Sequence, residues 1–138
     1  MMPEYIDVFI APIRDNLTAQ VVTEAAGLLL LLNIVLGVTS AVIRHDWSSK
    51  VMRSGVSNLV SVFTFAIVSL IVDAIVSVGI DIGFDAPVFV ACCTYVCIME
   101  IGSLMENIVD LNPKLKESPL FIVLRKVEPK PLEEAAHE

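Results

Sequence analysis

Apolar residues in this chain are concentrated in three long blocks separated by short polar segments. The blocks cover about residues 25–43, 55–80 and 87–109. A helix rises about 1.5 Å per residue, so roughly 20 apolar residues are needed to cross a hydrocarbon layer of about 30 Å. Each block is close to or above that length. We therefore predict an all-α integral membrane protein whose membrane domain, residues 21–112, contains three transmembrane helices.

The first residues, 1–20, form a shorter amphipathic segment. Its large apolar residues recur at helical spacing: Ile6, Phe9, Ile10 and Ile13. Because the segment is too short to cross a bilayer and contains Pro12, we expect an interfacial helix broken or bent near that proline. A frayed leader is the alternative. We do not expect a cleavable signal peptide, since no basic region precedes the first long block.

The charges of the polar connections predict the orientation of the helices. The first loop carries Arg44, Lys50 and Arg53, and further lysines and arginines follow the third block. The second loop, residues 81–87, contains two aspartates and no basic residue. Basic loops tend to stay in the cytoplasm. We therefore expect the N-terminus outside and the C-terminus in the cytoplasm.

The last part of the chain, residues 113–138, holds one further apolar run at residues 120–124. Five residues cannot cross a bilayer, so we expect a short amphipathic segment on the cytoplasmic membrane face. Arg125 and Lys126 would reach the lipid headgroups. The prolines and glutamates that follow predict a disordered tail.

Composition and charge support the membrane class and limit the partners. Hydrophobic residues make up 56% of the chain and charged residues 18%, which is more apolar than the usual soluble protein. The formal net charge is -7. A chain with this balance cannot neutralise many phosphates, so nucleic acid is excluded as a partner.

A polar stripe marks the end of the third block. Glu100, Ser103, Asn107 and Asp110 follow one another at intervals of three, four and three residues. This spacing places them on one face of a helix. Because carboxylates are costly at bilayer depth, the stripe has to face another helix, another subunit or water.

The first block carries a second line of small and polar residues, at Asn33, Gly37 and Ala41. A small-x-x-x-small pair such as Gly37 and Ala41 allows a neighbouring helix to approach closely, and Asn33 can hydrogen-bond across such a contact. We therefore predict that these residues form a helix-packing surface shielded from lipid. In the second block, Asp73 is either an intramembrane charge with a function or a residue at the outer interface.

Catalytic and metal-binding arrangements are poorly supported. Glu100 and Glu106 lie about 120° apart around a helix, so they cannot act together on one bond. The cysteines Cys92, Cys93 and Cys97 lack the histidine or second pair that would complete a zinc site. We predict that the protein is not an enzyme and needs no cofactor or metal.

Two arrangements of the polar lines remain open. They can close against one another within one protomer, or they can line contacts between subunits or a water-filled lesion. A chain of this size has no room for an internal transport pathway, so self-assembly into a homo-oligomer is the simplest hypothesis. The alternatives are an accessory or scaffold subunit of a larger membrane complex, and a small ion channel in which Glu100 forms a ring of charge.

Several motifs occur in a characteristic order along the chain. They are Asn33-x-x-x-Gly37-x-x-x-Ala41, then Ser48-Ser49-Lys50 and Arg53-x-Gly55, then Glu100-x-x-Ser103-x-x-Glu106-Asn107. In this order they resemble the toxin secretion/phage lysis holin family over about residues 28–116, with residues 100–107 as the most specific part. Two positions depart from the family pattern. Asn33 stands where an acid is common and Asn58 where a base is frequent, so a charge pair between spans is missing here.

The resemblance implies a phage or prophage protein of the bacterial inner membrane. Members of the family accumulate there and assemble into lesions that release a cell-wall-degrading endolysin, and relatives serve toxin export. The implied partners are further copies of the chain, membrane lipid, and an endolysin or exported toxin. We expect Gly37→Leu to block assembly and Glu100→Ala to change lesion formation or its timing.

Overall fold

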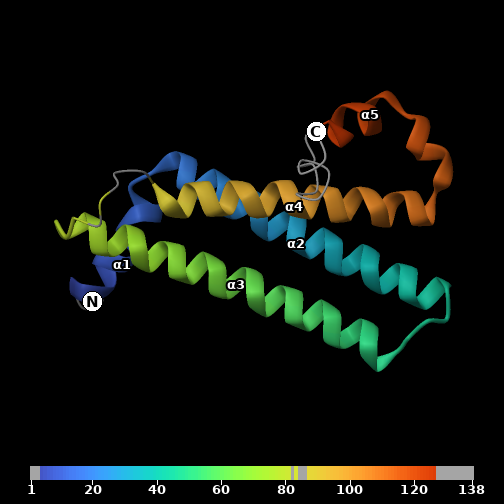
Figure 1. The fold of residues 1–138 in the computed structure, drawn as a ribbon, viewed down its shortest axis with the longest axis horizontal. Coiled ribbons are helices and arrows are strands. Elements are labelled where there is room, and N and C mark those ends of the chain that lie inside the picture. The colour runs from blue at the N-terminus through green and yellow to red at the C-terminus, as the bar shows by residue number, and fades with distance from the viewer. Residues whose placement is uncertain (1–3, 82, 84–86, 127–138) are drawn as a thin grey trace, which may run out of the picture.

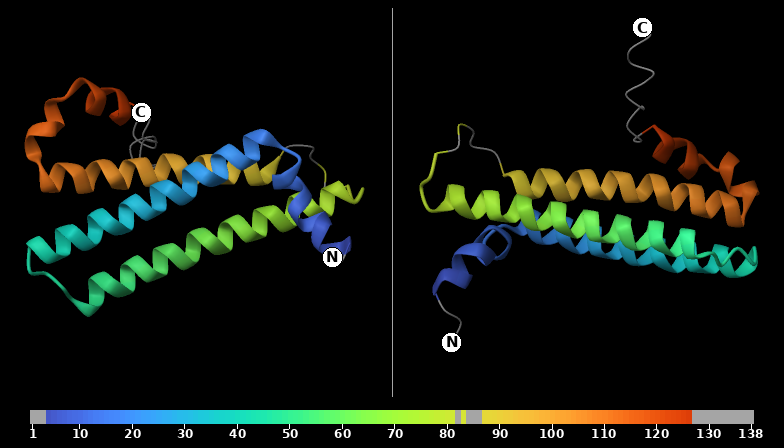
Figure 2. Two further views of the ribbon diagram at one scale, coloured as in Figure 1. Left: turned by 180° about the vertical axis from the view of Figure 1, so that it is seen from behind. Right: turned by 60° about the horizontal axis from the view of Figure 1, so that its bottom comes forward.

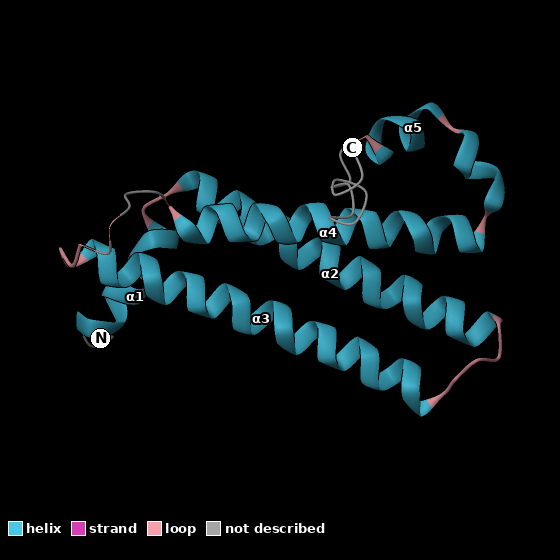
Figure 3. Ribbon diagram, in the orientation of Figure 1, coloured by secondary structure: helices cyan, strands magenta, loops and turns pink. Residues whose placement is uncertain are grey.

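The computed structural model describes residues 4–81, 83 and 87–126, and within these residues the chain is helical without strands (Figure 3). Three long helices are joined by short connections, with shorter helical segments at either end (Figure 1). In chain order the elements are α1 (Glu4–Arg14), α2 (Leu17–Ile43), α3 (Ser49–Ser77), α4 (Val88–Leu111), the 3-10 helix η1 (Pro113–Glu117) and α5 (Pro119–Arg125).

The three long helices are each long and apolar enough to cross a membrane, which confirms the predicted fold class. Two of them begin earlier than the apolar blocks indicate, because polar residues cap their first turns. The side chain of Asn16 accepts a hydrogen bond from the backbone N–H of Ala19, at 3.2 Å, and Ser48 does the same for Val51, at 3.3 Å. Such caps satisfy backbone donors that the helix leaves unpaired.

Helix α1 packs against α2 and α3 at the N-terminal end of the bundle. It includes Pro12 and ends at Arg14, just after the proline. Arg14 forms ion pairs with Asp7, at 3.0 Å, and with Asp15, at 2.9 Å. The hydrogen bond from Arg14 lowers the pKa of the exposed Asp15 carboxyl. Whether α1 lies in the membrane interface stays a prediction.

Helix α4 is the central element of the bundle. It packs along α2 and also contacts α3 (Figure 2). In the most apolar stretch of α4, 33% of the residues are buried, whereas the corresponding share is 11% in α2 and in α3. Few apolar side chains are buried, and three of them, Ala19, Phe89 and Cys93, form one core cluster. The remaining apolar surface is therefore available to lipid, as expected for a membrane domain.

After α4, the chain folds back as η1 and α5, which contacts α4 (Figure 2). Ser118 caps α5 by accepting a hydrogen bond from the N–H of Phe121, at 3.3 Å. The predicted amphipathic segment at residues 120–124 is thus helical. The predicted disordered tail lies outside the described residues, and the position of α5 on a membrane surface stays a prediction.

Candidate functional site

The polar stripe of α4 lies where this helix faces α2. Glu100 is only 5% exposed, and Gly102 and Met105 beside it are also buried. Small and flexible neighbours allow α2 to approach Glu100 closely. A carboxylate removed from water at this depth requires hydrogen-bond donors.

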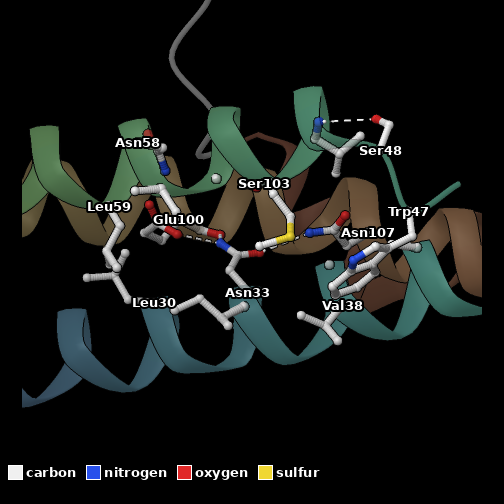
Figure 4. Close-up of a pocket in the computed structure, with 17 residues that line it drawn as sticks. Leu30, Asn33, Val38, Trp47, Ser48, Asn58, Leu59, Glu100, Ser103 and Asn107 are labelled. Carbon is white, nitrogen blue, oxygen red and sulfur yellow. Dashed lines mark hydrogen bonds between the residues drawn. The ribbon is translucent and has the colours of Figure 1, made fainter.

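Asn33 of α2 supplies those donors. Its side-chain nitrogen Nδ2 donates to the backbone oxygen of Glu100, at 2.9 Å, and to the carboxylate oxygen Oε2 of the same residue. Its oxygen Oδ1 accepts a hydrogen bond from Nδ2 of Asn107, at 3.2 Å (Figure 4). Interhelical hydrogen bonds in membranes contribute about 0.6–2 kcal/mol each. This network therefore joins α2 to α4.

A cavity of about 430 Å³ lies beside this network, between α2, α3 and α4 (Figure 4). All six residues that were predicted to pack helices line it: Asn33, Gly37, Ala41, Glu100, Ser103 and Asn107. The structure brings three of them together by hydrogen bonds and leaves the other three on the cavity wall. Of the two arrangements considered above, the polar lines of α2 and α4 therefore close against each other within one protomer only in part.

The described residues leave open space beside Gly37. A Cβ atom built on Gly37 meets no atom within 4 Å, and the same holds for Gly55 on the α3 wall. Small residues at such positions are typical of close helix contacts in membranes, yet nothing in the described residues lies within 4 Å of this Cβ position. Contact with a second copy stays a prediction for Gly37 and Ala41.

The α3 wall was not anticipated from the sequence. Trp47, just before α3, and Asn58 within it both line the cavity, and Figure 4 shows Asn58 on the Glu100 side of the cavity. A spacing signal existed, because Gly55 and Asn58 are three residues apart and share a helix face. The hydroxyls of Ser61 and Thr64 bond instead to the backbone of their own helix, each at 2.8 Å.

Asp73 lies outside the cavity and caps another helix. Its two carboxylate oxygens accept hydrogen bonds from the backbone N–H groups of Val88 and Phe89, both at 2.9 Å. The first turn of α4 follows Pro87, which makes no side-chain capping bond of its own. A carboxylate is favoured at this position by the free N–H groups and by the helix dipole. Asp73 therefore fixes the start of α4 against α3.

We predict that Asp73→Ala destabilises the start of α4 by about 0.5–2 kcal/mol, the usual cost of losing a helix cap. Hydrogen exchange of the Val88 and Phe89 amides in detergent micelles measures this loss. Asp81→Ala is the matched control, because Asp81 accepts a bond only from the nearby Gly83 N–H among the described residues. Equal protection of these amides in both variants would contradict the capping role.

The basic residues of the first loop lie at the end of the bundle where α2 and α4 end and α3 begins. Arg44 forms an ion pair with Asp110 of α4, at 3.0 Å, while both side chains remain about half exposed. Exposed pairs contribute little to stability. Lys50 and Arg53 are exposed on the first turns of α3. These positions fit a loop in contact with water and headgroups.

The acids and thiols of α4 differ in exposure and in their contacts. Glu100 is buried, whereas Glu106 is exposed on the same helix. The three cysteines are unbridged, and Cys97 Sγ contacts the backbone oxygen of Val22, at 3.7 Å. No group of three His, Cys, Asp or Glu side chains in the described part of the chain is placed to hold a metal ion.

Comparisons with known proteins find a family match. No curated protein and no solved structure matches the chain. The profile of the bacteriophage holin family matches residues 18–120, a region that includes α2, α3 and α4. Because this region is most of the chain, the protein belongs to the bacteriophage holin family.

Proposed function

We propose that this protein is a holin that self-assembles in the bacterial inner membrane and forms lesions through which an endolysin, or an exported toxin, crosses. The observation that carries the proposal is the surface around Gly37 and Ala41. It combines small residues with a buried polar network, and a Cβ atom built on Gly37 meets nothing within 4 Å among the residues that the structure describes. In membranes such surfaces are used for helix association.

In the proposed assembly, α2 of one copy packs against a helix of the next copy. The Asn33 and Glu100 pair lies beside this contact and holds α2 on α4, so each copy presents Gly37 and Ala41 on a fixed surface. The N-terminus lies outside and the C-terminus in the cytoplasm, which places Arg44, Lys50 and Arg53 on the cytoplasmic side. The positive-inside bias supports this orientation.

Expression in a bacterial host tests the function directly. The protein is induced with a cytoplasmic endolysin that has no export signal, and membrane potential and culture turbidity are followed. We expect an abrupt loss of membrane potential followed by lysis. Cells with the endolysin alone, or with the protein alone, should not lyse.

Two other outcomes would overturn the proposal. Unchanged growth and membrane potential at confirmed expression would indicate an accessory or scaffold subunit. Loss of potential without release of the endolysin would indicate a small ion channel. The three functions predict different combinations of membrane potential and culture turbidity, so one culture experiment separates them.

A further inference from the structure

The cavity between α2, α3 and α4 has the composition of a binding site for a small molecule. Its volume of about 430 Å³ lies within the range of roughly 300–1,000 Å³ that is typical of ligand pockets. The walls are mainly aliphatic and include Leu30, Val38 and Leu59 (Figure 4). A few polar side chains, among them Asn58 and Ser103, are distributed over this apolar surface. The cavity therefore suits a ligand with a large apolar part.

The charge in the cavity is unbalanced. Glu100 is the one ionisable residue among the 17 that line it. No ion pair in the part of the chain that the structure describes includes Glu100. Asn33 donates to one of its carboxylate oxygens, Oε2, and a hydrogen bond from a neutral amide does not cancel the charge. A cation in the cavity would do so, and the low dielectric of the surroundings strengthens that attraction.

Trp47 adds a second feature that favours a cation. Its indole lines the cavity beside Val38 (Figure 4) and is 57% exposed, so it lies on the outer part of the wall. The faces of tryptophan rings attract cations, and quaternary ammonium groups bind well to aromatic side chains. Figure 4 shows Trp47 and Glu100 toward opposite ends of the cavity, so the two side chains favour a cation at separate positions. A ligand with its charge at Glu100 can contact the aliphatic wall with its remaining atoms.

We propose that this cavity binds an amphiphilic organic cation, such as a quaternary ammonium or phosphonium compound or the amine of a lipid headgroup. Glu100 balances the charge of the ligand, and the apolar walls contact its hydrophobic part. Gly37 and Gly55 keep the cavity open, because larger side chains at these positions would project into it.

A consequence follows that rests on the proposed function. Gly37 and Ala41 belong to the cavity wall and also to the surface proposed to contact a second copy. A bound cation and a neighbouring helix cannot both occupy that space. Saturating cation should therefore reduce crosslinked oligomers in membranes. Binding to the single protomer does not depend on assembly, so failure of one proposal is distinguishable from failure of the other.

The experiment uses the full chain in a non-ionic, amine-free detergent and two probes of nearly the same shape. Tetraphenylphosphonium is a cation, and tetraphenylborate is its anionic counterpart. Trp47 is the single tryptophan of the chain, so its fluorescence reports directly on the cavity, and calorimetry gives a second measurement. We expect saturable binding of the cation and no saturable binding of the anion.

Substitutions test which residues form the site. Glu100→Gln retains an oxygen that can accept the bond from Asn33 and should weaken cation binding by about tenfold or more, because only the charge is lost. Glu106→Gln is the matched control, since Glu106 is exposed and absent from the cavity wall. Gly55→Leu should block binding of the cationic probe by filling the space. Equal affinity for the two probes, or unchanged affinity in Glu100→Gln, would overturn the proposal.

Titrations in two lipid mixtures distinguish a lipid amine from a free organic cation as the occupant of the cavity. The titration is repeated in nanodiscs of phosphatidylglycerol with and without phosphatidylethanolamine. Competition by phosphatidylethanolamine that is lost in Glu100→Gln identifies a lipid amine as the occupant. If phosphatidylethanolamine leaves the affinity for tetraphenylphosphonium unchanged, the cavity is a site for free cations. Absence of saturable cation binding in both lipid mixtures at low protein density, where protomers do not crosslink through the cavity, would overturn the proposal.

Discussion

Gly37→Leu is expected to abolish assembly and lysis while leaving the protomer folded. Outside its own stretch of helix, the Cβ of the new side chain meets no atom of the described residues within 4 Å, so we expect no clash at that atom. On the surface proposed to contact a neighbouring helix, a leucine would hold the two backbones apart and remove the close contact that small residues allow. The effect should therefore appear in the assembly and not in the fold.

Chemical crosslinking in membranes and the lysis assay with the supplied endolysin measure this effect. Gly27→Leu is the matched control, because Gly27 lies on the same helix, has equally open space around its Cβ, and is absent from the cavity wall. We expect normal oligomers and lysis from Gly27→Leu and neither from Gly37→Leu. If Gly37→Leu cultures lysed on the wild-type schedule at equal expression, the assignment of this surface would be wrong.

Asn33→Leu is expected to separate α2 from α4 at the polar network. The substitution leaves the Glu100 carboxylate without its side-chain donor and deprives Asn107 of its acceptor. Hydrogen bonds to charged groups contribute about 1.5–3 kcal/mol, and an orphaned buried group adds to the cost of their loss. Unfolding in mixed micelles should show a destabilisation of about this size.

Two further variants separate the network from a general effect of hydrophobicity. Thr39→Leu is the control on α2, because the Thr39 hydroxyl bonds to the backbone oxygen of Val35 in its own helix. It should change stability little. Combining Asn33→Leu with Glu100→Ala should cost less than the sum of the single variants, since the stranded carboxylate is then absent. Strict additivity would show that the two residues do not interact.

The same network bears on the timing of lysis. We expected Glu100→Ala to change lesion formation, and the structure gives a physical basis for that expectation. Glu100 accepts the hydrogen bond that ties α2 to α4, and α2 carries the surface proposed for assembly. Without this hydrogen bond, α2 would be held less rigidly on α4, and the positions of Gly37 and Ala41 relative to a neighbouring copy would be less fixed.

The fold class follows from local properties of the chain. Three apolar blocks of sufficient length predict three membrane helices, because the cost of leaving backbone groups unpaired in lipid forces such blocks into helices. The three-four spacing of Glu100, Ser103 and Asn107 placed them on one face for the same local reason. The early start of α3 was also encoded locally, in the cap at Ser48, but counting apolar residues does not detect it.

The partner of each polar residue depended on contacts between distant segments. Asn33 and Glu100 are 67 residues apart, and Asp73 caps a helix that begins 15 residues later. A helical pattern specifies which side chains share a face, but not the rotation or axial position of one helix against another. In lipid the rotation and axial position of a helix depend on side-chain packing and interhelical hydrogen bonds. Burial of apolar side chains contributes little there, because lipid tails are as apolar as a neighbouring helix. The chain's own pattern therefore indicated a polar face on α4, whereas the packing of α2, α3 and α4 determined that Asn33 bonds to this face and that Gly37 borders a cavity.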